Sequence, residues 1–551
     1  MSPPDDAPPP PGAAPRGARG WRRVLRRAER SAAAREVRDF RRAHEQRRRQ
    51  LPRAIVVGLL SGLVAVAFSR LLLTGDGWRR ALIAVALERR GAWLLLPPLL
   101  GAAGAGAAVW MVRRFAPEAA GSGIPHLKAV THDLRAMHWR RLLPVKFFGG
   151  VSAISAGLAL GREGPTIQMG GAIGQMVSGW FRCTPRERRT LIAAGAGAGL
   201  AGAFNAPLAG LVFVLEEIQR DFAPAMFVTT LIAAVTADVV TRLLNGQLPV
   251  LHVAVHPVPP LLALPVALAL GVVAGGFGIL FNRALLAALD AFQALRGWPA
   301  WVGGGLAGLF AGCVGLIAPD VLGGGHRLVE ETLSGDVSLA RLLTVFPLRF
   351  ALTATSYGCG APGGIFAPLL VLGSQLGLAA GWLAQWTLPG AFDHPETFAV
   401  VGMAAYFAAI VRAPLTGIVL MVELTGDYAL VLPLLVASLT AYGIADYLRD
   451  RPIYEALLER DLLRGGDGPP LEATLLLELT VAPNAPFVGR TVQSLGLPSG
   501  CVLVTVRRGL REVVPGADWQ LDAGDHITAV IDAQARDAIV RLRRGTGALA
   551  D

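Results

Sequence analysis

An ionisable pair stands between two apolar runs in the segment Gly161-Arg162-Glu163-Gly164-Pro165, where one run ends at Leu160 and the next begins at Thr166. A carboxylate at bilayer depth costs about 2.5–3.5 kcal/mol even on a lenient insertion scale, so Glu163 is expected to be functional. Glycines allow close backbone approach, and proline suits the first turn of a helix. The segment therefore predicts a helix start whose amides face a negative group. Alternatively, Glu163 only stabilises its own helix terminus, and its removal would leave function intact.

Two further segments have the same build, Gly121-Ser122-Gly123-Ile124-Pro125 and Gly363-Gly364-Ile365-Phe366-Ala367-Pro368. A helix terminus supplies only ~0.3–1 kcal/mol when exposed and up to ~2 kcal/mol when partly buried, so several must cooperate to dehydrate an ion. Taken alone, each segment is explained by a capped, kinked helix with glycines for packing. Three together predict a convergent anion site, to which Ser122 adds a hydroxyl donor. Its supporting loop residues are predicted to be Gly121, Gly123, Gly161, Arg162, Gly164 and Gly364.

The helices that position these segments are predicted to lie in a lipid bilayer. Of the 551 residues, 53% are hydrophobic and only 17% are charged, and the mean hydropathy is +0.48. About a dozen apolar runs lie between residues 54 and 447, and many are near or below the ~20 residues that span hydrocarbon. The predicted fold class is therefore an all-α polytopic membrane protein with short, tilted and broken helices.

The membrane part contains an internal repeat. Residues 206–212 (APLAGLV) return at 413–419 as APLTGIV, and Glu216 and Glu423 follow at the same offset. The helix starts Gly161–Pro165 and Gly363–Pro368 obey the same spacing of roughly 205 residues. Duplicated halves with interrupted short helices are typical of transporters whose site lies between the halves. We assign Glu216 and Glu423 a structural role. The predicted halves are residues 54–250 and 258–460.

The regions outside the membrane part differ in composition. Residues 1–20 are rich in Pro, Ala and Gly and are predicted to be disordered. Residues 21–53 are arginine-rich and predict a cytoplasmic helix, which either only sets orientation or also binds anionic lipid. The formal charge of +12 therefore indicates how the chain is oriented across the membrane rather than nucleic-acid binding. Residues 461–470 are predicted to be a linker and 471–545 a small α+β domain. Its strands are expected near 474–480, 501–506 and 526–531, and a helix over 533–544.

From Leu51 to Arg460 the chain resembles the CLC family of chloride channels and chloride/proton antiporters. The resemblance rests on the three helix starts and on LPVKFFGG at 143–150, AFNAPLAG at 203–210, RAPLTG at 412–417 and RPIY at 451–454. It implies an inverted-repeat membrane domain and a homodimer with one anion pathway per subunit. Chloride and protons are the expected partners, with no cofactor and no metal. The expected location is the bacterial inner membrane, with both termini cytoplasmic.

The resemblance also implies roles for particular residues. In that family the central chloride is held by the serine of the first helix start, a tyrosine near the end of the membrane domain and backbone amides of the third helix start. The matching residues are Ser122, Tyr454, Ile365 and Phe366. Hydroxyl and amide donors suit a transported anion because a fixed cation would hold it too tightly. Without the resemblance, Tyr454 would be interpreted as an interfacial anchor.

Two glutamates are implied to couple the anion to protons. Glu163 matches the family's gating glutamate, whose carboxylate occupies an anion position when ionised and leaves it when protonated. Glu217 matches the internal proton-transfer glutamate of the antiporters, which favours exchange over the alternative, a passive glutamate-gated chloride channel. A further alternative is that Glu216 and Glu217 cap the end of their helix and are merely solvated.

Two positions depart from the family pattern. His126 stands where the family often has glutamate, Lys128 lies close by, and their effect is left open. Ser122, in place of the proline of nitrate-preferring relatives, favours chloride but leaves a bromide or nitrate leak open. A membrane enzyme finds no support, because the sequence has no metal-ligand spacing, nucleotide fingerprint or nucleophile triad.

The C-terminal residues 471–545 resemble the TrkA-C domain of potassium-transport regulators. The matching runs are Phe487–Thr491, Leu497-Pro498, Val513–Pro515 and Leu521–Asp525. Such domains commonly dimerise, and some bind small ligands such as cyclic dinucleotides. The sequence names no ligand, so regulation and simple support of the dimer both stay open. A remaining alternative is a ligand sensor with a vestigial membrane part.

Overall fold

The structure is a computed structural model that describes residues 18–220, 224–246, 260–335, 337–390, 392–464, 475–509, 511–532 and 536–547. The chain divides into two compact units, residues 1–127 with 137–453 and residues 128–136 with 454–551. Residues 1–17 of the predicted disordered tail and 465–470 of the predicted linker lie outside the described residues. The first unit is the membrane unit, and the second carries the small C-terminal domain.

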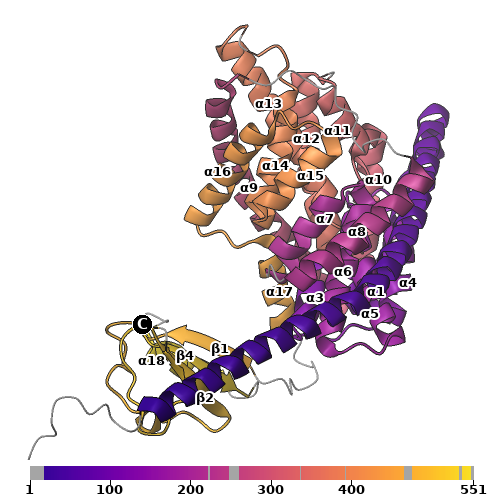
Figure 1. Ribbon diagram of the computed structural model, residues 1–551. Coiled ribbons are helices and arrows are strands. Elements are labelled where there is room, and N and C mark those ends of the chain that lie inside the picture. The colour runs from indigo at the N-terminus through magenta and orange to yellow at the C-terminus, as the bar shows by residue number, and fades with distance from the viewer. Residues whose placement is uncertain are drawn as a thin grey trace, which may run out of the picture. The chain divides into compact units, whose positions relative to one another are not determined.

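The helices confirm the predicted all-α membrane fold. In the first half they are α1 (Ala18–Arg89), η1 (Gly91–Leu95), α2 (Leu96–Phe115), η2 (Pro117–Ala119), α3 (Ile124–Thr131), α4 (Trp139–Ser155), α5 (Glu163–Trp180), α6 (Pro185–Phe204), α7 (Pro207–Phe213), the π-helix η3 (Val214–Gln219) and α8 (Pro224–Asn245). In the second half they are α9 (Ala263–Gln293), η4 (Ala294–Gly297), α10 (Val302–Ile317), η5 (Pro319–Val321), α11 (His326–Leu333), α12 (Leu339–Gly358), α13 (Phe366–Thr387), α14 (Thr397–Val411), α15 (Pro414–Thr425) and α16 (Val431–Tyr447). In Figure 1 the first-half helices are purple to magenta and the second-half helices are salmon to orange. The two sets adjoin where α7 contacts α15.

Among the described residues, five helices are long and apolar enough to cross a membrane. They are Gln50–Arg89, Gly91–Phe115, Met226–Asn245, Ala263–Gln293 and Phe366–Thr387. Four shorter apolar helices, α10, α14, α15 and α16, accompany them. The last of the five spans, α13, is the most buried, which places it in the protein interior rather than against lipid.

Two boundaries differ from the predicted ones. Helix α1 continues from Ala18 to Arg89 with Pro52 inside it, so the basic stretch and the first apolar run share one helix. Residues 461–464, which we predicted as linker, belong to α17 (Ile453–Arg464). Both differences arise because charged and apolar residues can both form helix. A change of composition from one to the other therefore does not by itself end a helix.

The internal repeat is visible in the backbone. Helices α6 and α14 both end in a left-handed residue, Asn205 (φ 55°) and Arg412 (φ 66°). The alanine that follows has φ −131° and ψ 78° in the first half and φ −122° and ψ 71° in the second. A proline then opens α7 or α15, where its missing amide hydrogen removes no helical bond.

The two halves cap each other reciprocally. Glu423 accepts hydrogen bonds from the amides of Leu208 and Ala209 in the first turn of α7, at 3.0 and 2.7 Å. Glu216 does the same in the first turn of α15, at 3.1 and 2.7 Å. A carboxylate at a helix N-terminus satisfies otherwise free amides and interacts favourably with the helix dipole. The reciprocal contact confirms the structural role predicted for these two glutamates, and it is the relation expected of a two-fold axis.

A buried cation holds the matching loop in each half. Lys146 Nζ on α4 donates to the carbonyl oxygens of Ala119 and Gly121, at 3.0 and 2.6 Å. Arg349 on α12 donates through Nη1 to the carbonyl oxygen of Val321, the counterpart of Ala119. Both cations are fully buried. Each one ties the short loop after a long helix, α2 or α10, to a later helix of the same half, α4 or α12.

The C-terminal domain is the predicted small α+β fold. Its antiparallel sheet has the order β1-β4-β2-β3. The elements are β1 (Leu475–Thr480), η6 (Val492–Leu495), β2 (Cys501–Arg508), β3 (Arg511–Val513), β4 (His526–Ile531) and α18 (Arg536–Gly545). Alternate residues of β4 are buried, as expected for a sheet covered on one face. The three-residue β3 was not predicted, because so short an edge strand leaves no alternating pattern to detect.

Candidate anion site

Two of the three predicted helix starts are joined by their backbones. Gly161 donates its amide to Gly364 O at 2.7 Å, and Gly364 donates to Gly161 O at 2.9 Å. The pair is antiparallel, and each glycine is the counterpart of the other in the repeat. The first turns of α5 and α13 are thereby held side by side at the junction of the halves.

The third helix start is fastened to the same point. Gly121 donates to Ala361 O at 3.2 Å, and Gly363 donates to Gly121 O at 3.0 Å, in a parallel bridge of Gly121 with Pro362. Lys146 binds the Gly121 carbonyl from the other side. The structure therefore brings all three predicted motifs together.

Several of the predicted glycines are required for this approach. A Cβ added at Gly164 would lie 2.9 Å from Gly364 Cα and 3.0 Å from both Ser122 Cα and the Ser122 carbonyl oxygen. Backbone atoms cannot turn aside as a flexible side chain can. Gly123 has φ +79°, and a Cβ there would lie 2.1 Å from the Gln168 side chain. Close contact therefore excludes a side chain at Gly164 and at Gly123. At Gly123 the backbone conformation excludes one as well.

Glu163 is the first residue of α5, and its side chain is fully buried. The carboxylate folds back over Gly161, where an added Cβ would lie 2.2 Å from Glu163 Oε2 and 3.1 Å from the Ala367 amide nitrogen. It is directed at the amides of Glu163 itself and Ala367, although neither contact has the full geometry of a hydrogen bond. Arg162 Nε lies 4.0 Å from Glu163 Oε1. A carboxyl group thus occupies the space beside the first turn of α13.

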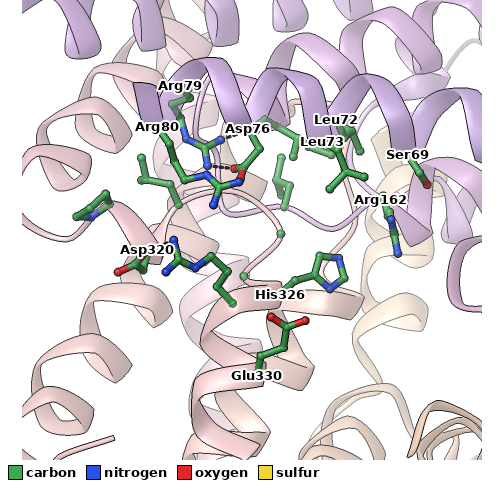
Figure 2. Close-up of a pocket in the computed structure, with 17 residues that line it drawn as sticks. Ser69, Leu72, Leu73, Asp76, Arg79, Arg80, Arg162, Asp320, His326 and Glu330 are labelled. Carbon is green, nitrogen blue, oxygen red and sulfur yellow. Dashed lines mark hydrogen bonds and ion pairs between the residues drawn. The ribbon is translucent and has the colours of Figure 1, made fainter. Parts of the chain in front are cut away.

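A cavity of about 260 Å³ meets this region at Arg162. Figure 2 shows Arg162 and His326 on one part of its wall, with Arg79, Arg80 and Asp76 opposite. Asp76 forms ion pairs with both Arg79 and Arg80. We call this space the arginine-lined cavity; its charged lining residues are Asp76, Arg79, Arg80, Arg162, Asp320, Arg327 and Glu330. Its lining has more guanidinium than carboxylate groups.

The predicted chloride-binding residues have different surroundings. Ser122 is fully buried, and its hydroxyl lies 3.4 Å from the Tyr357 hydroxyl. Ile365 caps α13, and Phe366 follows as its first residue. The Phe366 ring packs against Phe407, with ring centroids 4.4 Å apart. Packing on this side fixes the start of α13 and keeps its amides directed at the junction.

Glu217 is also buried, at 1% exposure, and lies in the π-helix η3 beside the capping residue Glu216. The alternative that both glutamates are merely solvated is therefore wrong. Tyr454 is fully buried in the first turn of α17, but it belongs to the other compact unit, so its place in the anion site stays a prediction. His126 is buried, and its Nδ1 lies 3.3 Å from Gln168 Nε2.

Two residues of the site were missed by the sequence analysis. Lys146 carried a signal, since a lysine inside the apolar run 142–160 is an intramembrane cation and so a candidate for function. Tyr357 carried none, because an aromatic residue at the end of an apolar helix is ordinary. Its proximity to Ser122 is visible only in three dimensions.

Fold and site together define an integral membrane protein whose two repeated halves meet at a junction of helix N-termini. A family model described as voltage gated chloride channel matches residues 104–446, and the TrkA-C domain matches residues 476–543. The chain belongs to the voltage-gated chloride channel family, whose members are transporters and not enzymes.

Relatives whose names state a function match most of the chain. The H(+)/Cl(-) exchange transporter ClcA of Vibrio vulnificus strain YJ016 is 43% identical over 440 residues, which are 76% of this chain and 91% of the relative. ClcA of Klebsiella pneumoniae strain ATCC 700721 is 42% identical over 420 residues, 75% of this chain and 88% of the relative. A solved slow cyanobacterial Cl-/H+ antiporter is 38% identical with a TM-score of 0.73, covering 76% of this chain and 98% of its own. A eukaryotic CLC transporter, 22% identical with a TM-score of 0.63, shares the fold.

Proposed function

We propose that the protein exchanges chloride for protons across the membrane, with Glu163 as the gate of the anion pathway. One observation carries the proposal: the fully buried Glu163 carboxylate lies beside the first turn of α13, where three helix starts meet. A site that attracts this carboxylate also suits chloride, because both carry one negative charge and both accept hydrogen bonds from amides. The relatives named as H(+)/Cl(-) exchangers favour exchange over passive conduction.

Chloride is bound by neutral donors in this proposal. The Ser122 hydroxyl and the Ile365 and Phe366 amides replace its water shell, and the Tyr454 hydroxyl completes the site. Several half-charges from helix termini hold the ion firmly enough to enter but weakly enough to leave. Lys146, a nearby full charge, has carbonyl oxygens as its partners and serves the loop rather than the ion.

Protons compete with chloride at Glu163. The ionised carboxylate occupies the anion position, whereas protonation removes its charge and its attraction to the amides. The freed position then accepts chloride. Glu217, buried in η3, is the second proton-transfer residue, and a pair of intramembrane acids in series provides a proton relay.

The arginine-lined cavity is the outer approach to Glu163 in this proposal. Helix α1 rises about 1.5 Å per residue, so its stretch from Gln50 to Arg79 is longer than the ~30 Å hydrocarbon core. With the basic N-terminal stretch in the cytoplasm, the cavity beside Ser69 and Arg80 faces the opposite side. Its arginines raise the local chloride concentration at low ionic strength.

Reconstitution in liposomes tests exchange and the roles of both glutamates. We expect the wild-type protein to pump protons when only a chloride gradient is imposed, and to reverse its current away from the chloride Nernst potential. Glu163→Ala should still move chloride but lose proton coupling, because the gate and its proton are both gone. Glu217→Gln should also move chloride without protons, because an amide cannot carry the proton.

The neighbouring Glu216→Gln variant is the matched control. It should keep proton coupling and lower only thermal stability, because Glu216 caps α15 rather than carrying protons. A wild-type current that reverses at the chloride Nernst potential with no pumped protons would establish the passive channel instead. Proton coupling that persists in Glu163→Ala would refute the gate assignment.

A further inference from the structure

Tyr357, in the last turn of α12, is a buried neighbour of Ser122. Its hydroxyl oxygen lies 3.4 Å from Ser122 Oγ and 3.4 Å from the Ser122 amide nitrogen. The fit is close, because a Cβ added at Gly121 would lie 2.8 Å from the same oxygen. The phenol is therefore placed against the loop that carries the proposed chloride ligand.

The donors and acceptors around these hydroxyls determine where each proton points. The Ser122 amide can only donate, so the Tyr357 oxygen accepts from it. The Tyr357 proton then needs an acceptor, and among the described residues its contact that can accept is Ser122 Oγ. Ser122 Oγ also accepts from the Ile124 amide at 3.4 Å. With two donors directed at its oxygen, Ser122 keeps its own proton for a further acceptor.

The nearby backbone does not take that proton. The Gly121 carbonyl oxygen, the adjacent acceptor of the loop, already receives the Lys146 ammonium at 2.6 Å and the Gly363 amide at 3.0 Å. When the neighbouring acceptors already receive their hydrogen bonds, a hydroxyl donates to an acceptor that does not. At the junction of helix starts, that acceptor is an anion.

We propose that Tyr357 is a positioning residue of the anion site: its hydroxyl donates to Ser122 Oγ and so directs the Ser122 proton at the bound halide. The inference rests on the proposed function, since it assigns Tyr357 a part in chloride binding. Tyr357 acts through Ser122 and does not itself touch the anion. A serine hydroxyl can otherwise rotate about its Cβ–Oγ bond. Fixing its direction before the anion binds strengthens binding without adding a contact.

Chloride titration calorimetry of the full-length protein in detergent tests this role. Tyr357→Phe removes one oxygen atom, and we expect chloride binding about three- to tenfold weaker, as for the loss of one neutral hydrogen bond. Tyr406→Phe is the matched control. Tyr406 is fully buried on α14, and its hydroxyl has no hydrogen-bond partner among the described residues, so its removal should leave chloride affinity unchanged.

A double-mutant cycle separates positioning from simple packing. In a Ser122→Ala background, Tyr357→Phe should cause no further loss, because the hydroxyl that it directs is absent. Wild-type affinity in Tyr357→Phe would overturn the inference. An equal loss in both backgrounds would also overturn it, since that pattern indicates an effect independent of Ser122. A Tyr357→Phe unfolding temperature well below that of Tyr406→Phe would point to packing instead. The readout is binding, so a wild-type protein that binds chloride but pumps no protons would refute exchange and leave this inference standing.

Discussion

Neighbouring residues of one type are given different roles by the direction of their side chains. Glu216 accepts amide hydrogens from the first turn of α15, whereas Glu217, the next residue, is buried in the protein. The π-helix η3 shifts the register of the chain at this point, and such segments are frequent at functional sites. Residue type alone therefore does not distinguish a structural glutamate, such as Glu216, from a buried one that we propose as a proton carrier, such as Glu217.

Asp525 gives the C-terminal domain a predictable response to acid. Burial of its carboxylate would raise its pKa, but Arg508, which donates from Nε and Nη2 at 2.7 Å each, and the Asp522 amide, which donates at 2.9 Å, together outweigh burial and hold the pKa below its usual value. The folded pKa is lower than the unfolded value of ~3.9, so the pair stabilises the fold above that pH. This contribution is lost as the pH falls through the lowered pKa.

We expect hydrogen exchange in β2 and β4 of the full-length protein to stay slow from pH 7 to about pH 5, after correction for intrinsic rates, and to accelerate below about pH 4. Asp525→Asn should show faster exchange already at pH 7 and little further change in acid. Asp522→Asn is the control, because Asp522 is a more exposed partner of the same arginine. Unchanged protection of Asp525→Asn at pH 7 would show that the pair does not stabilise the domain.

At the scale of elements, the proposed anion site is built from helices whose starts touch through glycine. Gly164 on α5 meets backbone atoms of Gly364 and Ser122, which come from two other motifs. We expect Gly164→Ala to weaken chloride binding at least tenfold, because a Cβ 2.9–3.0 Å from these atoms separates the helix starts. Chloride titration of the purified variant measures the loss.

Gly179 near the end of the same helix provides the control. A Cβ at Gly179 would meet no atom within 4 Å, so Gly179→Ala should bind chloride as the wild type does. Both substitutions replace glycine by alanine one residue from an end of the same helix, so the two variants differ in what the added Cβ contacts. Wild-type affinity in Gly164→Ala would mean that the helix starts do not need to touch.

At the scale of the whole molecule, the membrane unit is expected to work without the C-terminal domain. Helix α17 belongs with residues 128–136, as the Arg135 hydrogen bond to Asp461 O at 2.7 Å shows, so a truncation should keep it. We propose that the chain forms a homodimer through the membrane unit, with one pathway per subunit. Deleting residues 465–551 should then preserve both chloride flux in liposomes and the dimer mass in detergent.

Each departure from that outcome has a distinct meaning. A monomeric truncated protein would show that the TrkA-C domain holds the dimer together. A dimeric truncated protein without chloride flux would support a ligand sensor with a vestigial membrane part. Altered flux in an intact dimer would instead indicate regulation by the domain.

The sequence by itself determined the local features of this protein. Apolar run lengths, Gly/Pro helix starts and β-branched strands act over a few residues, so they predicted the all-α membrane fold, the three motifs and the small α+β domain. The repeat added long-range information, because duplicated segments must occupy equivalent places. It also identified Glu216 and Glu423 as structural residues.

Only the tertiary structure decided which of these local features meet. Gly161 pairs with Gly364, and Tyr357 reaches Ser122 across 235 positions of the chain. Such contacts depend on how whole helices pack, and a local pattern contains no information about a partner so distant in sequence. The structure also distinguished Glu217 from a solvated helix end, since burial is a property of the packed molecule. The convergence of the helix starts was therefore predictable from their number and their repeat, whereas the contacts that hold them together beside Glu163 were decided by the packing of the two halves.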